Sequence, residues 1–377
     1  MDKLLILLQV GDTPRVAGLP AAVRAANAAG ALSPGKVIFC GPGAAAIGAW
    51  RAHLGPARNL AFGLNGENAA AQIAAGSPLL AVSSEGFPGA EGLVRFEAQA
   101  RSSGKNLRWV FHGRTVAAYY PDASALLGQN PAAVEALENG GAAYESADWW
   151  PVNDQKAVAR AEKHLFSKLP KDTDGYLARF DRKISMAVSR VLIETPVTPN
   201  QITTASLLIG LLGSWWLATG AYPMQVLAAF LLWSCCILDG CDGEVARLKH
   251  LCSPGGGLYD VVSDNIVHVA IFVAIPWNIH HNKPEAHFLL AGILLVTGLL
   301  ACMFSVWHLV LRRPESERGA AGLVVERVAS RDFIYLIFLL TLLGRLDWFL
   351  WTAGIGSHLF NLVLWAIFLR TPKGPSL

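Results

Sequence analysis

Two stretches of this sequence, DGCDGEVAR at residues 239–247 and GGLYDVVSD at residues 256–264, carry acidic residues into apolar surroundings. The first stretch ends the apolar segment 226–238, and the second leads into the apolar segment 261–277. A carboxylate at membrane depth costs about 2–3 kcal/mol even on the lenient insertion scales, so it calls for a functional explanation. The residues concerned are Asp239, Asp242, Asp260 and Asp264.

The composition indicates a membrane protein with a separate polar region. The chain has 377 residues, of which 53% are hydrophobic and 16% charged. Residues 1–175 have the composition of a soluble protein, whereas residues 198–371 form a series of long apolar stretches. The net charge of +3 and the lack of a Lys/Arg-rich run argue against nucleic acid as a partner. The six cysteines show no metal-ligand spacing and imply no disulfide framework.

Residues 1–150 alternate short apolar runs with alanine-rich stretches, which is typical of an α/β domain with a mainly parallel sheet. The N-terminal apolar run lacks a basic flank, so it favours a buried strand over a signal peptide. The run GPGAAA at 41–46 favours a tight turn over a dinucleotide fingerprint, because no acidic residue follows about 20 positions later. We expect strands at 4–10, 36–40, 60–64 and 79–82, two strands within 107–120 broken at His112 and Gly113, and helices at 21–29, 44–53 and 69–75.

The segment 151–197 predicts a connection between the two regions. Residues 151–168 are charged and helical in pattern, and residues 169–175 read as a linker. Residues 176–193 predict an amphipathic helix with a basic polar side, suited to an anionic membrane surface. A helix docked on a soluble domain is the alternative, but the first apolar span follows directly.

Six spans are expected in the third region, 198–371, each near the roughly 20 residues that a bilayer requires. Thirteen Lys and Arg residues lie on one set of flanks and two on the other, so the positive-inside rule predicts that both termini are cytoplasmic. We therefore expect a multi-pass protein of the cell (inner) membrane. The predicted spans are 199–219, 223–246, 256–277, 286–311, 331–350 and 351–370, with a weak boundary between the last two around Trp348–Gly356.

The spacing of the four aspartates predicts one site. Asp239 and Asp242 are three residues apart and Asp260 and Asp264 four apart, so each pair shares a helix face. Because the two helices are consecutive, they are expected to be antiparallel neighbours whose carboxylates converge. Such an all-oxygen site suits Mg²⁺ or Mn²⁺ rather than zinc. Several glycines would let a nucleotide approach the backbone, and a nearby arginine could hold a phosphate: Gly240, Gly243, Gly256, Gly257 and Arg247.

These residues resemble the signature of the CDP-alcohol phosphotransferases: Asp-x-x-Asp-Gly-x-x-Ala-Arg, eight residues, Gly-x-x-x-Asp-x-x-x-Asp. The signature is complete, and the resemblance extends over about 174–371. It implies an all-α domain of six transmembrane helices preceded by a juxtamembrane helix, a homodimer, and a CDP-alcohol donor with a hydroxyl acceptor. The alternative, that the aspartates merely balance the charges of Arg247 and Lys249, has little support in so complete a pattern.

The resemblance also implies roles for individual residues. Two divalent ions would be held by Asp239, Asp242 and Asp260, with Asp264 near the second ion and acting as general base. The nucleotide would be accommodated by Gly243, Ala246 and Gly256. Arg247 would contact phosphate, with an ion pair to Glu244 as the structural alternative. Pro199, Asn200 and Thr203 resemble the family's entry motif near the nucleotide, with an N-cap as the alternative for Asn200.

The N-terminal domain resembles, weakly, the sugar-phosphate nucleotidyltransferase domains fused to this membrane family in inositol-phosphate cytidylyltransferase and di-inositol-phosphate phosphate synthase proteins. The resemblance rests on Gly11, Arg15 and the segment 18–20. An active domain would have a longer glycine-rich loop than the segment 9–15 provides. We therefore expect a degenerate domain with a structural, dimerising or regulatory role.

The sequence thus predicts an integral-membrane, metal-dependent enzyme that transfers a phosphatidyl or phosphoalcohol group from a CDP-alcohol to a hydroxyl and releases CMP. A transporter is the alternative from another class, but transporters usually repeat such residues in both halves near the midplane. A soluble nucleotide-binding protein with a passive anchor would not need six spans. The loop 312–331 and the basic helix could bind a phosphorylated acceptor such as an inositol phosphate, or they could simply reflect the positive-inside rule.

Overall fold

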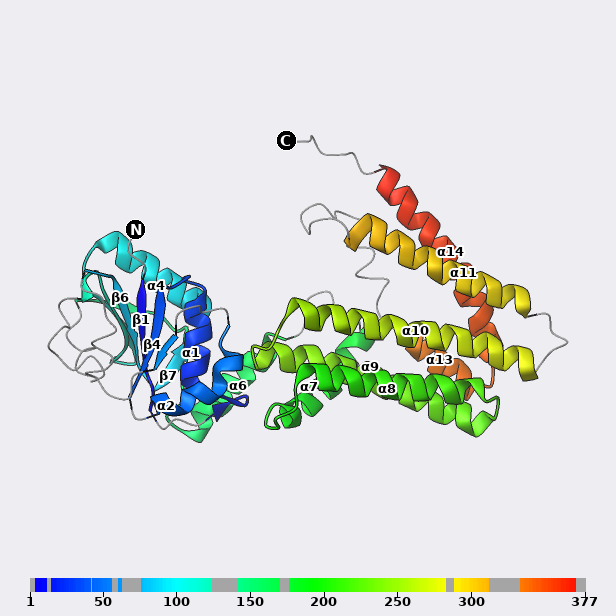
Figure 1. Ribbon diagram of the computed structural model, residues 1–377, viewed down its shortest axis with the longest axis horizontal. Coiled ribbons are helices and arrows are strands. Elements are labelled where there is room, and N and C mark those ends of the chain that lie inside the picture. The colour runs from blue at the N-terminus through cyan, green and yellow to red at the C-terminus, as the bar shows by residue number, and fades with distance from the viewer. Residues whose placement is uncertain are drawn as a thin grey trace. The chain divides into compact units, whose positions relative to one another are not determined.

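The computed structural model describes residues 4–11, 15–41, 43–55, 60–62, 76–123, 141–169, 176–282, 288–311 and 333–370. The chain divides into two compact units (Figure 1). The first contains Met1–Leu169, Leu192–Pro196 and Ala246–Leu251, and the second contains Pro170–Val191, Val197–Val245 and Cys252–Leu377. The helix expected at 69–75 and the loop 312–331 lie outside the described residues.

The first unit is built on a seven-stranded sheet with the order β10-β8-β9-β6-β1-β4-β5. Neighbouring strands are parallel except at β6–β9 and β8–β9, which confirms the mainly parallel α/β prediction. The strands are β1 (Leu5–Gln9), β4 (Lys36–Cys40), β5 (Leu60–Phe62), β6 (Leu79–Val82), β8 (Leu107–Phe111), β9 (Arg114–Tyr120) and β10 (Ala142–Glu145).

Both faces of this sheet are covered, because alternate residues of β1 enter two different cores. Ile6 and Leu8 pack in one cluster and Leu5 and Leu7 in another, as expected where helices lie over a parallel sheet. Two short antiparallel pairs complete the unit: β2 (Arg15–Val16) with β3 (Leu19–Pro20), and β7 (Gly86–Pro88) with β11 (Trp149–Pro151). The helices are α1 (Ala21–Gly30), α2 (Ala44–Ile47) followed by the 3-10 helix η1 (Gly48–His53), α4 (Ala90–Ser103) and α6 (Gln155–Ser167).

The second unit is helical, and five of its helices are long and apolar enough to cross a membrane. The four predicted spans between 199 and 311 correspond to α8, α9, α10 and α11. In Figure 1, α8 lies beside α10, and α11 pairs with α14. The helices are α7 (Tyr176–Leu192), α8 (Pro199–Ala218), α9 (Tyr222–Leu248), α10 (Pro254–Asn282), α11 (Leu289–Val306) followed by the π-helix η4 (Trp307–Leu311), α13 (Phe333–Leu342) and α14 (Leu346–Arg370).

The predicted boundary between the fifth and sixth spans is wrong. Helix α14 runs unbroken through residues 348–356, and the chain turns instead before Leu346. Gly344 has φ +65° there, a left-handed conformation that glycine adopts at little cost. The described part of α13 has 10 residues, too few by itself to cross a bilayer. The six predicted spans are therefore replaced by five candidate spans and one short apolar helix among the described residues.

Candidate active site

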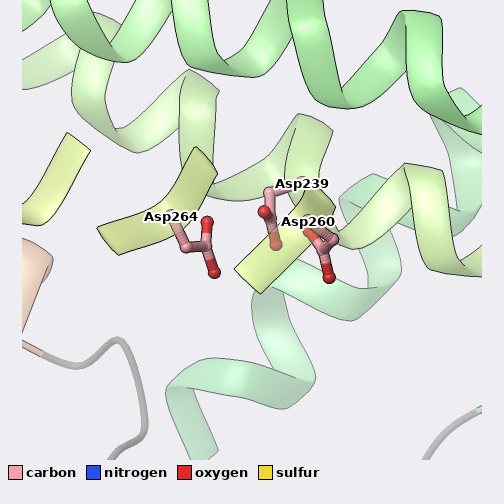
Figure 2. Close-up of side chains that lie close together, drawn as sticks. All are labelled: Asp239, Asp260 and Asp264. Carbon is pink, nitrogen blue, oxygen red and sulfur yellow. The ribbon is translucent and has the colours of Figure 1, made fainter. Parts of the chain in front are cut away.

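Three aspartates from two consecutive helices meet in the second unit. Asp239 comes from α9, and Asp260 and Asp264 come from α10. Each offers a carboxylate oxygen, and these oxygens all lie within 4.8 Å of one another (Figure 2). Asp239 is buried, and the other two are half-buried. Oxygen ligands at such distances suit a hard divalent cation, so these residues fit the Mg²⁺ or Mn²⁺ that the sequence implied.

Asp242 lies beside this trio rather than within it. It follows Asp239 by about one turn of α9, and its Oδ2 atom accepts a hydrogen bond from the Thr203 hydroxyl of α8, with 2.5 Å between the oxygens. The Oδ1 atom of Asp260 is buried and has no hydrogen-bond partner among the described residues, so it is available to a cation.

The hairpin between α9 and α10 explains why these carboxylates meet. Helix α9 ends at Leu248 and α10 begins at Pro254, so the connection is as short as the sequence suggested. Proline suits the first turn of a helix, where its missing N–H is not needed. The Ser253 hydroxyl accepts a hydrogen bond from the Gly256 amide at 3.0 Å and so satisfies one free donor of that turn.

The beginning of α8 approaches the beginning of α10. A Cβ atom on Gly256 would lie 3.3 Å from Asn200 Oδ1, tighter than an ordinary contact. Asn200 is not the N-cap, because α8 starts at Pro199 and Thr198 occupies that position. The Thr198 amide donates to Gln201 Oε1 at 2.9 Å. The N-cap alternative is therefore wrong, and the exposed Asn200 faces the same region as Gly256.

Arg247 is exposed, and its side chain has no hydrogen bond or ion pair with another described residue. Glu244, its suggested partner, instead pairs with Arg182 at 3.0 Å. The Lys249 ammonium donates to the Thr195 carbonyl at 2.6 Å. An ion pair between Arg247 and Glu244 is therefore not formed. Gly243 and Ala246 are half-buried on the same stretch of α9.

A small pocket adjoins Asp239 and Asp264. Its volume of about 10 Å³ leaves room for one water molecule at most. The other lining residues are Leu232, Cys235, Cys236, Val267, His268, Ile271 and Ile334.

Sequence reasoning missed the contacts that α7 makes with this part of the bundle. Arg182 and Ser185 both bind Glu244 of α9. Asp181 accepts hydrogen bonds from Trp233 of α9 and from Tyr335 of α13. The amphipathic pattern of 176–193 assigned these polar residues to a membrane surface. The sequence feature that could have indicated these contacts is Glu244, an acidic residue inside the second predicted span.

Two sequence features of the first unit have structural explanations: Arg15 of the nucleotidyltransferase resemblance, and the run at 41–46. Arg15 lies over the ring of Trp50, 4.9 Å from its centroid. Gly41 has φ +108°, and the Ala44 amide donates to its carbonyl at 3.1 Å. This hydrogen bond confirms the expected tight turn. Glycine is needed at position 41 because a Cβ atom there would lie 2.6 Å from the Val10 carbonyl oxygen.

Comparison with known proteins gives the membrane unit a family. Residues 196–368 match the CDP-alcohol phosphatidyltransferase family model. The chain is 29% identical over 208 residues to the bifunctional IPC transferase and DIPP synthase of Archaeoglobus fulgidus, covering 54% of this chain and 40% of that protein. It is 28% identical over 185 residues to the phosphatidylinositol phosphate synthase of Corynebacterium glutamicum, covering 45% of this chain and 77% of that protein.

Among solved structures, the chain resembles a phosphatidylinositol phosphate synthase of Mycobacterium tuberculosis with CDP-DAG bound. The sequence identity is 17%, the TM-score is 0.37, and the match covers 52% of this chain and 98% of that one. The chain spans 40% of the length of the Archaeoglobus fulgidus relative. The aspartates 239, 242, 260 and 264, on the two helices that meet in Figure 2, fall inside the matched region. Residues 196–368 therefore match the CDP-alcohol phosphatidyltransferase family with all four signature aspartates included.

Proposed function

We propose that this chain transfers a phosphatidyl or phosphoalcohol group from a CDP-alcohol to a hydroxyl acceptor and releases CMP. The observation that carries the proposal is the convergence of Asp239, Asp260 and Asp264 inside an apolar helical unit. The family of residues 196–368 supports the same reaction. The similarity to the phosphatidylinositol phosphate synthase of Corynebacterium glutamicum supports a phosphorylated polyol, such as an inositol phosphate, as the acceptor.

The residues of the site divide the work of the reaction. Asp239, Asp242 and Asp260 would hold two divalent cations, which would offset charge on the pyrophosphate and on the leaving CMP. Asp264 would take the proton from the acceptor hydroxyl. The acceptor oxygen then bonds to the β-phosphorus, and the bond from that phosphorus to the bridging oxygen breaks, leaving the oxygen on CMP.

The nucleotide would lie along the start of α8 and the end of α9. Asn200 of α8 lies close to Gly256 in the first turn of α10, and a side chain at position 256 would crowd the asparagine amide. Gly243 and Ala246 offer small side chains on the neighbouring turn, and Arg247 is free to contact a phosphate. Thr203 supports this arrangement through Asp242 rather than by contact with the nucleotide.

The wider organisation is also part of the proposal. We infer three segments: a nucleotidyltransferase-like domain at 1–150, a linker and juxtamembrane helix at 151–197, and a membrane domain at 198–371. The charge asymmetry of the flanks supports cytoplasmic termini in the cell membrane. A homodimer follows from the resemblance. The N-terminal domain would have a structural or regulatory role, because the loop at 9–15 is short for a triphosphate cradle.

The decisive experiment measures release of labelled CMP by purified protein with Mg²⁺. CDP-diacylglycerol and soluble CDP-alcohols would each be offered with candidate acceptors, including an inositol phosphate. We expect Asp264→Asn to abolish release, while Asp347→Asn, an aspartate of α14 outside the site, keeps it. Full turnover by Asp264→Asn would refute the general-base role. If no CDP-alcohol yields CMP, the proposed reaction is wrong.

A further inference from the structure

A buried charged network joins α7 to the helix that carries Asp239 and Asp242. The Glu244 side chain is 0% exposed and lies in an ion pair with Arg182, with 3.0 Å between Nη1 and Oε1. The Ser185 hydroxyl donates to the same Oε1 at 2.6 Å. Glu244 sits only two residues after Asp242, but nothing in the proposed reaction uses it.

The network lies on the back of α9 relative to the aspartates. At about 100° per residue, Glu244 is about 140° around the helix from Asp239 and about 160° from Asp242. The same back face packs on α7, since the Cys241 thiol donates to the Ser185 carbonyl at 3.4 Å. Gly240 adjoins it, and a Cβ atom there would lie 3.5 Å from the Ser185 side chain. Rotating α9 to break these contacts would turn the aspartates away from α10.

A second attachment fixes α7 further along α9. Asp181 Oδ1 accepts a hydrogen bond from Trp233 Nε1 at 3.1 Å, and the Tyr335 hydroxyl of α13 donates to the same atom. Trp233 and Glu244 are about three helical turns apart, so they project from nearly the same side of α9. Two polar attachments along one face restrict both the rotation of α9 and its sliding along its axis.

The energetics argue that the pair does more than stabilise the fold. A buried ion pair often gains little over apolar residues of similar volume, because both charges lose their hydration. Here Glu244 Oε2 is also buried without a hydrogen-bond partner among the described residues. An apolar contact would avoid that cost. The ion pair and the hydrogen bond fix the direction in which Glu244 points, which an apolar contact would not do.

We propose that the Arg182–Glu244 pair, with Ser185, is a positioning device that holds the turn bearing Asp239 and Asp242 at the angle needed to bind a divalent cation with α10. Glu244 acts through the helix and touches neither the cation nor the substrate. This inference rests on the proposed function for the identity of the ligand. Its test reads cation binding directly, without turnover.

The test measures Mn²⁺ binding to the purified full chain by electron paramagnetic resonance, with thermal unfolding recorded for each variant. Substitution of residues that orient metal ligands without touching the metal typically weakens metal affinity by about 10–100-fold. We expect Glu244→Gln and Arg182→Met to weaken Mn²⁺ binding by about 10-fold, and Ser185→Ala to do so by less. Asn361→Leu is the matched control, because it removes a different buried interhelical bond, from Ser305 of α11 at 2.5 Å.

A double variant separates positioning from stability. Arg182→Met with Glu244→Met replaces the pair by apolar side chains, so thermal stability should recover while Mn²⁺ binding stays weak. Recovery of both would overturn the proposal, as would wild-type affinity in Glu244→Gln and Ser185→Ala. If the unaltered chain binds no Mn²⁺, the proposal also falls, since there is no cation site to position. If it binds Mn²⁺ but releases no CMP, only the proposed function fails.

Discussion

The Thr203 hydroxyl of α8 donates a hydrogen bond to Asp242 Oδ2 of α9, with 2.5 Å between the two oxygens. Both side chains are buried, at 2% and 5% exposure. Hydrogen bonds to ionised groups contribute about 1.5–3 kcal/mol, more than those between neutral groups. The bond therefore fixes the carboxylate that stands next to the three-aspartate cluster.

Removing this hydroxyl should weaken the site without unfolding the bundle. We expect Thr203→Val, which keeps the shape of the side chain, to lower CMP release by about 10-fold at limiting Mg²⁺, because Asp242 is no longer oriented. Thr203→Ser should restore most of the activity, since it keeps the donor. The measurement is the rate of CMP release against Mg²⁺ concentration. Equal curves for Thr203→Val and the unaltered chain would contradict the role.

Divalent cations should stabilise the folded protein. Carboxylate oxygens of Asp239, Asp260 and Asp264 crowd within 4.8 Å of one another, so their negative charges repel until a cation binds. A ligand at 100 times its Kd adds about 2.7 kcal/mol to the free energy of unfolding. Thermal unfolding with Mg²⁺ and then with EDTA measures the effect. Asp260→Asn should abolish the shift, whereas Asp347→Asn should keep it.

Cys252 offers a test of membrane orientation. It is exposed in the loop between α9 and α10, which we place in the cytoplasm. A membrane-impermeant maleimide should label it in inverted vesicles and leave it unlabelled in intact cells. Cys252→Ser is the control. Cys40 should not react in either case, because burial in the sheet raises the pKa of its thiol to about 12. Labelling of Cys252 in intact cells would reverse the proposed topology.

Close packing of α11 on α14 depends on Gly298. A Cβ atom at this position would lie 2.9 Å from Ser357 Cβ. Gly298→Ala should therefore lower the free energy of unfolding by about 1–3 kcal/mol, as overpacking does, and adding Ser357→Gly should recover part of the loss. Gly356 is the matched control, since a Cβ atom there would meet nothing within 4 Å. Thermal unfolding of the four proteins, with Gly356→Ala unchanged or slightly more stable, checks this.

Acid should weaken the N-terminal unit through His164. Burial lowers the pKa of this histidine, and the nearby Lys168 lowers it further; its ring stacks on Trp150, 3.8 Å between centroids. The unfolded chain therefore takes up a proton first, near pH 6.5, and the stability contributed by neutral His164 is lost as pH falls below that value. We expect unfolding midpoints to fall less between pH 7 and 5 in His164→Phe than in His112→Asn, an exposed control.

The sequence predicted regular elements well where local pattern decided them. The strands at 36–40 and 79–82 are as expected, because continuous apolar runs between turn residues leave few alternatives. Helix α4 was missed even though Leu93, Phe96 and Ala100 have helical spacing, since charged and polar residues separate its apolar positions. The turn before α14 was misplaced because Gly344, Arg345 and Asp347 form only a short polar interruption between two long apolar stretches.

In the candidate site, too, the sequence predicted contacts between residues that are close in the chain and missed contacts between residues that are far apart. The aspartates were found because their spacing along two neighbouring helices carries the geometry. Arg182 and Glu244 are 62 residues apart, and Asp181 and Tyr335 are 154 apart. No periodicity connects such residues, so only the folded chain reveals that α7 contacts the back of α9.

The short α9–α10 hairpin has a consequence for assembly. Asp239 and Asp264 are 25 residues apart in the chain, so bringing them together closes a small loop. The entropy of loop closure grows only with the logarithm of loop length, and contacts between near neighbours form fastest. A nascent chain inserted as far as α10 already contains every carboxylate of the site, as well as the α7 contacts on Glu244. Tyr335 can add its bond to Asp181 only after most of the remaining chain has been made.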